Sequence, residues 1–294
     1  ADGSGLLLSG SAHRCGNGGE VMRTSVHAKR KMLVYLILFL ALCIFSLIAD
    51  SLAPHDAELV NLLEAKKAPG GEYLMGTDWL GRCIWSRILS GASSSIFASL
   101  MIVALSMLVG CTIGLISGYM GGIADEIMMR IVDVFLAFPG IVLSIAVAGM
   151  LGPGIRNGVL ALAATGWTQY ARLIRSYVLS LREENYVKAA RLNGQSECSI
   201  LLHHIFPNAI RPVVVTGTLH LSGAMLSISG LSFLGLGSSS AEWGSMLSEG
   251  RSLMQQCPWV VLYPALAIFM VTILFNLFGD SVRDALDPKE TMKL

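Results

Sequence analysis

The chain has 294 residues, of which 53% are apolar and only 14% are charged, and its formal net charge is +1. An average soluble domain carries about 25% charged residues, so this composition excludes a disordered chain, a collagen-like fibre and an ordinary cytosolic enzyme. The near-neutral charge argues against nucleic-acid binding, which needs a basic excess. We therefore expect an all-α integral membrane protein whose chain crosses the bilayer several times.

Stretches without charged residues predict six transmembrane helices. A spanning helix needs about 20 mostly apolar residues, and five of the six uncharged runs have at least 18. The fourth run is shorter, but it extends to about Tyr177 if Arg172 and Arg175 reach the membrane surface. The second run is long enough for one long helix with a glycine-rich exit. In chain order the runs are 32–49, 88–124, 134–155, 157–171, 212–241 and 252–279.

The distribution of Lys and Arg predicts the orientation. With six spans, 15 of these residues fall on the side of the N-terminus and 6 on the other side. Positive charges are in excess on the cytoplasmic side, so both termini are expected to be cytoplasmic.

The predicted organisation begins with a leader. Residues 1–21 are rich in Gly and Ser and lack the apolar core of a signal peptide. We interpret them as a non-native or disordered leader, with Met22 as the natural start. The remaining predicted parts are a tail with the first transmembrane helix (22–53), an extracytoplasmic loop with a short helix (54–86) and a core with five transmembrane helices (87–290).

The polar segment after the first span is expected to contain a short helix from about Trp79 to Ser90, capped by Thr77 and Asp78. One interpretation is an interfacial helix with Trp79 and Trp85 at the membrane surface. The other is an extracytoplasmic lip over a translocation path, and the two are compatible.

The polar segment after the fourth span predicts two short helices. Ser180 and Glu183 have the spacing of a capping box, and Gly194 suits the end of the first, amphipathic helix. The second helix is expected from about Ser196 to Ile205, closed by Pro207. Such a segment either docks in a groove of another protein or lies on lipid headgroups.

The stretch from Lys188 to Gly194, with Pro207 thirteen residues after the glycine, resembles the EAA loop of binding-protein-dependent ABC importers. Lys188 stands where the family usually has Glu. The resemblance implies that segment 182–207 contains the coupling helix, between spans 4 and 5, that docks on an ATPase subunit. The residues to which it assigns this role are Tyr186, Val187, Lys188, Ala189, Ala190, Arg191, Gly194 and Pro207.

Three further stretches resemble the C-type permease subunit of the dipeptide/oligopeptide/nickel family, which implies a type I ABC importer fold. They are GTDWLGRCIWSR, LSFLGLG followed by EWGSML, and GDSVRDALDP. Cys83 stands where the family usually has Asp, and the linker 238–241 is short and lacks the usual prolines. The extracytoplasmic motif consists of Gly76, Thr77, Asp78, Gly81, Arg82, Ser86 and Arg87.

The chain has no P-loop with which to bind and hydrolyse ATP, because none of its lysines follows a glycine as that motif requires. The resemblance implies a non-enzymatic permease in the bacterial inner membrane, without a cofactor of its own. Its expected partners are a B-type permease, two ABC ATPases that bind ATP and Mg, an extracytoplasmic substrate-binding protein and membrane lipid, but no nucleic acid. The expected cargo is di- or oligopeptides; the alternatives are nickel or another metal chelate, or a stand-alone channel or carrier without an ATPase.

Several residues are candidates for the cargo path or for contact with the binding protein, each with a structural alternative. Arg130 has the spacing of an ion pair with Glu126, and His220 could instead bond a neighbouring helix. Pro139 and Gly140 predict a kink in the third span. No metal site is predicted. The candidates are Arg130, Asp133, His220, Phe233, Glu242 and Trp243.

Overall fold

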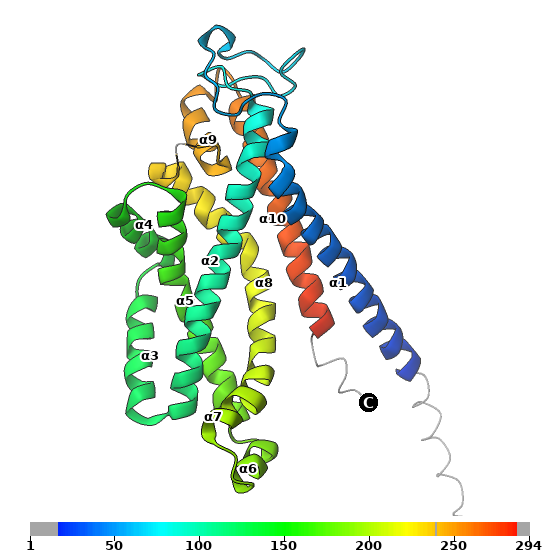
Figure 1. Cartoon of the computed structure of the whole chain (residues 1–294), viewed down its shortest axis with the longest axis vertical. Helices are drawn as coiled ribbons and strands as arrows, with labels where there is room; N and C mark the ends of the chain where they lie inside the picture. The colour runs from blue at the N-terminus through cyan, green and yellow to red at the C-terminus, as the bar shows by residue number, and fades with distance from the viewer. Residues whose placement is uncertain (1–16, 239, 287–294) are drawn as a thin grey trace, which may run out of the picture.

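The computed structural model describes residues 17–238 and 240–286, and this part of the chain is an elongated bundle of helices without a β-strand (Figure 1). Two π-helical segments flank α8, at Leu201–Ile205 and Ser232–Leu236. The helices are α1 (Asn17–Ile48), α2 (Ile84–Met120), α3 (Gly122–Leu136), α4 (Gly140–Leu151), α5 (Ile155–Leu181), α6 (Asn185–Leu192), α7 (Glu197–Ile200), α8 (Phe206–Leu231), α9 (Trp243–Gly250) and α10 (Trp259–Leu286).

Within the described residues, four helical segments are long and apolar enough to cross a membrane. They are Ala28–Ile48, Ile84–Met120, Glu197–Leu236 and Trp259–Leu286. The pair α3 and α4 counts as a fifth span if the two helices are taken together. Four of the six predicted spans are thus confirmed, and the bent pair accounts for a fifth.

The predicted break at Pro139 and Gly140 is confirmed, and it is larger than a kink. Helices α3 and α4 meet at 89°, and Pro139 stands directly before the first residue of α4. Proline has no backbone N–H to continue α3. The third predicted span is therefore two separate helices.

Helix α5 covers the fourth predicted span, but its composition is too polar to identify it as a membrane-spanning helix. It packs closely along α2, where glycines follow one another every four residues. A Cβ atom added at Gly110 would lie 2.4 Å from the carbonyl oxygen of Trp167, and one at Gly114 would lie 2.2 Å from that of Ala171. Small residues allow two helix backbones to approach in this way. The face of α5 that packs on protein can therefore carry polar residues, such as the buried Thr168, that contact with lipid would disfavour.

Two boundaries at the start of the chain differ from the prediction. Helix α1 begins at Asn17, five residues before Met22, so position 21 is not a boundary of secondary structure. Residues 1–16 of the predicted leader lie outside the described residues. The prediction of a separate short helix from Trp79 was wrong. Residues 79–80 form a turn, 81–82 are irregular, Cys83 forms an isolated bridge with Thr77, and α2 runs without interruption from Ile84.

Two predicted helix ends in the polar segment after α5 were also wrong. Ser180 does not cap a helix, since it lies inside α5, and α6 begins after Glu184. Pro207 does not close a helix but lies in the first turn of α8. The π-helical segment Leu201–Ile205 leads directly into this turn, so the helix continues through Pro207 without the one hydrogen bond that a proline N–H cannot make.

Candidate functional site

Segments of possible functional importance lie at the two ends of the bundle and between them. Helices α6 and α7 form one end, and α9 with the segment between α1 and α2 forms the other (Figure 1). We call these the α6 end and the α9 end.

At the α6 end, α6 has one buried and one exposed face. Val187 and Ala190 are buried in a small apolar core with Ile200 and Ile205. Gly194 has φ = +75°, a backbone conformation that favours glycine, and it turns the chain towards α7. The EAA-like residues are therefore divided between the two faces. Within α6, the exposed EAA-like residues are Tyr186, Lys188, Ala189 and Arg191, and Leu192 beyond them is 89% exposed.

A polar contact joins α6 and α7 to the end of α2. Arg191 donates hydrogen bonds through Nε (3.1 Å) and Nη2 (3.2 Å) to the carboxylate of Glu197, and the hydroxyl of Tyr119 donates to the same carboxylate. The hydrogen bonds to Glu197 are the main cause that raises the pKa of Arg191, and the neighbouring Tyr119 hydroxyl adds to the effect. Tyr119 and Glu197 are 78 residues apart, so no local pattern predicts this contact.

At the α9 end, three residues of the extracytoplasmic motif form a buried ionic network. Asp78 Oδ2 accepts hydrogen bonds from Arg82 Nε (2.7 Å) and Arg87 Nη1 (2.9 Å). Both arginines also contact Glu249 at the end of α9, with Arg87 Nη1 2.8 Å from its Oε2. The sequence analysis missed Glu249, which lies 162 residues from Arg87.

The other motif residues shape the backbone around this network. Gly76 and Gly81 both have φ = +76°, and a Cβ at Gly81 would lie only 1.8 Å from the carbonyl oxygen of Asn61. The hydroxyl of Thr77 donates to Glu64 O (2.5 Å). Ser86 Oγ accepts from the backbone N–H of His55 (3.1 Å). All seven motif residues therefore have a structural role in holding this segment on the bundle.

Glu242 and Trp243 are inside the protein, 1% and 3% exposed. Trp243 Nε1 donates to Ile88 O (2.9 Å), and Glu242 accepts from the hydroxyl of Ser232 (2.5 Å). Their side chains are therefore not exposed for contact with a binding protein or for anchoring at the membrane surface, because Trp243 packs against α2 and Glu242 against the segment Ser232–Leu236. Phe233 is half-buried, with the Arg251 guanidinium 6.0 Å from its ring centre.

The charged candidates of α3 bind neighbouring side chains. Arg130 Nη2 lies 3.6 Å from Glu126 Oε1, as their spacing predicts. Asp133 Oδ1 accepts from Arg172 Nη2 of α5 at 2.5 Å. Neither side chain lines the cavity described next.

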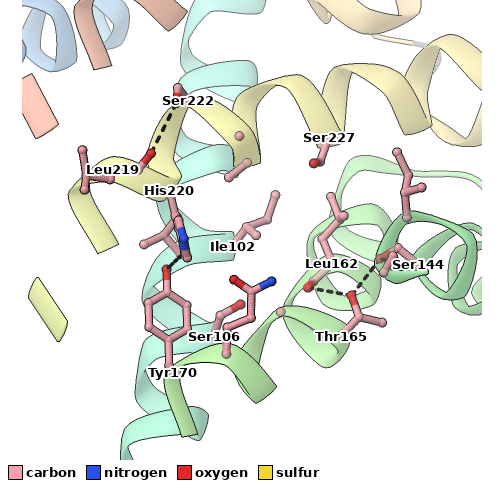
Figure 2. A pocket seen from close by; sticks show the side chains of 17 residues that line it. Ile102, Ser106, Ser144, Leu162, Thr165, Tyr170, Leu219, His220, Ser222 and Ser227 are labelled. Carbon is pink, nitrogen blue, oxygen red and sulfur yellow. Dashed lines mark hydrogen bonds between the residues drawn. The ribbon is translucent and has the colours of Figure 1, made fainter. Parts of the chain in front are cut away.

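Between the two ends, a cavity of about 400 Å³ lies among α2, α4, α5 and α8 (Figure 2). Of the candidate path residues only His220 lines it, and its Nδ1 lies 3.0 Å from the Tyr170 hydroxyl. The predicted bond between His220 and a neighbouring helix is thus confirmed. The sequence analysis missed the rest of the polar lining, because hydroxyl residues within apolar helices have no distinctive spacing. These residues are Ser106, Ser144, Thr165, Gln169, Tyr170, Ser222 and Ser227.

Comparisons with known proteins agree with the resemblance seen in the sequence. Residues 110–291 match the family model described as binding-protein-dependent transport system inner membrane component. The dipeptide transport system permease protein DppC of Alkalihalophilus pseudofirmus is 40% identical over 259 residues, which is 87% of this chain and 84% of the relative. The glutathione transport system permease protein GsiD of Pectobacterium atrosepticum is 41% identical over 259 residues, with 87% and 85% covered.

A third relative is the probable D,D-dipeptide transport system permease protein DdpC of Escherichia coli, 40% identical over 258 residues, with 87% of this chain and 86% of the relative covered. The fold is similar to that of a chain in the crystal structure of an amino acid ABC transporter with histidines. That similarity has a TM-score of 0.52 and 19% identity and covers 66% of this chain and 91% of the other. The family match and these identities show that this multi-pass protein is a permease, not an enzyme, and belongs to the binding-protein-dependent transport system inner membrane components of ABC importers.

Proposed function

We propose that this chain forms half of the translocation path for di- or oligopeptides in an ATP-driven importer. The observation that carries this proposal is the 40% identity, over 87% of the chain, with a dipeptide transport system permease. Relatives named for glutathione and D,D-dipeptide transport cover the same share of the chain. Their named cargoes share a peptide backbone, and this supports peptides as the class of cargo.

The complete importer would contain a second, B-type permease, two ABC ATPases that bind ATP and Mg, and an extracytoplasmic substrate-binding protein, all in or beside membrane lipid. The exposed face of α6 is the proposed contact with one ATPase. Its buried face, through Val187 and Ala190, belongs to the same apolar core as residues of α5 and α8. Movement of the ATPase on binding ATP would therefore displace the transmembrane helices, which is how a partner shifts a conformational equilibrium.

In this proposal six spans cross the membrane: α1, α2, the α3–α4 pair, α5, α8 and α10. Helix α5 is included because its 27 residues are long enough and its close contact with α2 shields it from lipid. The excess of Lys and Arg supports a cytoplasmic position for the α6 end and both termini. The α9 end would then face the binding protein.

Two alternatives remain from the sequence. The match to a binding-protein-dependent family argues against a stand-alone channel or carrier. A nickel or metal-chelate cargo within the same kind of complex has no specific observation in its favour. We therefore propose peptides alone as cargo.

The test is purification of the chain from its native membrane in mild detergent, followed by reconstitution of the recovered complex in liposomes. We expect a second six-span permease and P-loop ATPases to co-purify, and the complex to import radiolabelled Ala-Ala only with ATP and the binding protein. Recovery of the chain alone, under conditions that preserve other ABC complexes, would contradict the importer. Import of nickel but not of Ala-Ala would contradict the peptide cargo.

A further inference from the structure

The cavity among α2, α4, α5 and α8 contains a polar group that has no partner among the described residues. Ser106 in α2 is only 2% exposed, and its hydroxyl oxygen is buried without a hydrogen bond. Gly166 lies opposite, and a Cβ there would lie 2.9 Å from Ser106 Oγ. Gly166 has no side chain that could bond this hydroxyl, and both residues line the cavity. A buried hydroxyl without a partner costs free energy, so a molecule in the cavity would gain by bonding it.

Other polar side chains around the cavity already have partners within the chain. The hydroxyls of Ser144 and Thr165 are 2.7 Å apart, and the Tyr170 hydroxyl is 3.0 Å from His220 Nδ1 (Figure 2). Ser222 Oγ donates to Leu219 O (3.3 Å). These bonds fix the orientation of the lining, so that a guest would meet a preformed polar surface. Such fixed orientation lowers the entropic cost of binding.

The chemistry of the lining defines the class of guest. None of the lining residues is Asp, Glu, Lys or Arg. The lining offers a carboxylate or ammonium group no opposite charge, so the charged termini of a peptide would stay at the open, hydrated side of the cavity. A peptide bond is uncharged, and it offers one N–H donor and one C=O acceptor. A serine hydroxyl can accept a hydrogen bond from the peptide N–H and can donate one to the peptide C=O. The cavity of about 400 Å³ is within the usual range for small-molecule sites.

We propose that this cavity is a subsite for the uncharged backbone amide of a peptide in transit, with Ser106 Oγ as its direct hydrogen-bond partner. The inference rests on the proposed peptide cargo and assigns one place on the path where that cargo is held. Gln169 and Ser227, on α5 and α8, add an amide and a hydroxyl to the same lining. The subsite binds the feature that all peptides share, so it serves cargo with different side chains.

The test compares Ser106→Ala with the matched control Ser99→Ala in the complete importer. Ser99 lies two turns earlier in α2 and is equally buried, but its hydroxyl donates to Ile96 O (2.6 Å) and does not line the cavity. Each variant is reconstituted in liposomes with saturating binding protein and radiolabelled Ala-Ala. Loss of one hydrogen bond predicts an uptake rate about three- to tenfold lower for Ser106→Ala. Complex yield and ATPase activity without peptide should not change, and Ser99→Ala should import at the wild-type rate.

A second measurement locates the cargo directly. A benzophenone-bearing dipeptide is trapped in the wild-type complex by light, and the modified segments are identified by mass spectrometry. We expect labelling of α2, α5 or α8 at the cavity, reduced by excess unlabelled Ala-Ala. Labelling of the second permease alone would overturn the subsite, since the cargo would then lie outside this cavity.

The outcomes separate this inference from the function on which it depends. A wild-type complex that imports no Ala-Ala contradicts the proposed function. A wild-type complex that imports Ala-Ala at the same rate as Ser106→Ala contradicts the subsite alone. Equal losses in Ser106→Ala and Ser99→Ala also contradict it, because they indicate a structural effect of removing any buried serine hydroxyl from α2.

Discussion

Asp78 and Arg87 form a buried ion pair at the α9 end, with Arg87 Nη1 2.9 Å from Asp78 Oδ2 and each residue only 1% exposed. The pair joins the segment before α2 to α2 itself, and Glu249 extends it to α9. Charges in such a place need their partners, because water is not available to replace them. The network is therefore expected to matter for stability more than ion pairs at the surface.

Asp78→Ala should lower the free energy of unfolding by about 3–5 kcal/mol, since it removes the buried carboxylate that both arginines share and leaves them the partly exposed Glu249, with the half-exposed Glu58 3.8 Å from Arg82. Denaturant unfolding of the purified protein in mixed micelles measures this change. The matched control is Glu126→Ala, which removes a carboxylate from the exposed Glu126–Arg130 pair and should change stability by at most about 1 kcal/mol. Similar losses for the two variants would show that the buried network contributes no more than a surface pair.

Gly114→Ala should destabilise the bundle by about 1–3 kcal/mol, because the new Cβ would meet Ala171 O at 2.2 Å and force α2 away from α5. The control is Gly149→Ala in α4, where a Cβ meets no atom within 4 Å. Alanine is the better helix former, so the control should be neutral or more stable by up to about 1 kcal/mol. The measurement is again denaturant unfolding. Equal stability of the two variants would contradict the close packing of α2 and α5.

Leu192→Ser should reduce binding of the ATPase at least about tenfold if the exposed face of α6 is the docking surface, because exposed apolar side chains commonly provide contact energy in helix-in-groove interfaces. Leu192 is 89% exposed, so the change should leave the fold of this chain intact. Leu63 at the α9 end is 92% exposed and provides the matched control Leu63→Ser. Co-purification of the ATPase with each variant gives the result. Full recovery of the ATPase with Leu192→Ser would exclude this residue from the interface.

Trp243→Phe should cost about 1–3 kcal/mol, because it removes the 2.9 Å hydrogen bond to Ile88 O and leaves space beside α2. Trp79→Phe is the control, since Trp79 is 45% exposed and should tolerate the change with little loss. Thermal unfolding of the two variants separates a buried tryptophan from one at the surface. If only the Trp79 variant were destabilised, the placement of α9 against α2 would be wrong.

Local sequence features determined the positions of α1, α2, α8 and α10, and the break before α4. The reason is that an uncharged run of about 20 residues specifies a spanning helix by itself, and Pro139 followed by Gly140 weakens a helix locally, since proline supplies no N–H and glycine is a poor helix former. The turn at Gly194 was also predictable from local sequence. Its φ is +75°, and glycine is the residue that most readily adopts a positive φ at the end of a helix. The order of the motifs in the chain was also enough to indicate the family.

Only the tertiary structure decided which side chains are buried and which meet. Trp243 was expected at a surface, but the packing of α9 against α2 encloses it. Glu249 completes the network of Arg82 and Arg87 from more than 160 residues away. The cavity around Ser106 exists because α2, α4, α5 and α8 converge there. Contacts of this kind depend on the relative placement of helices, which hydrophobic patterns along one chain do not specify.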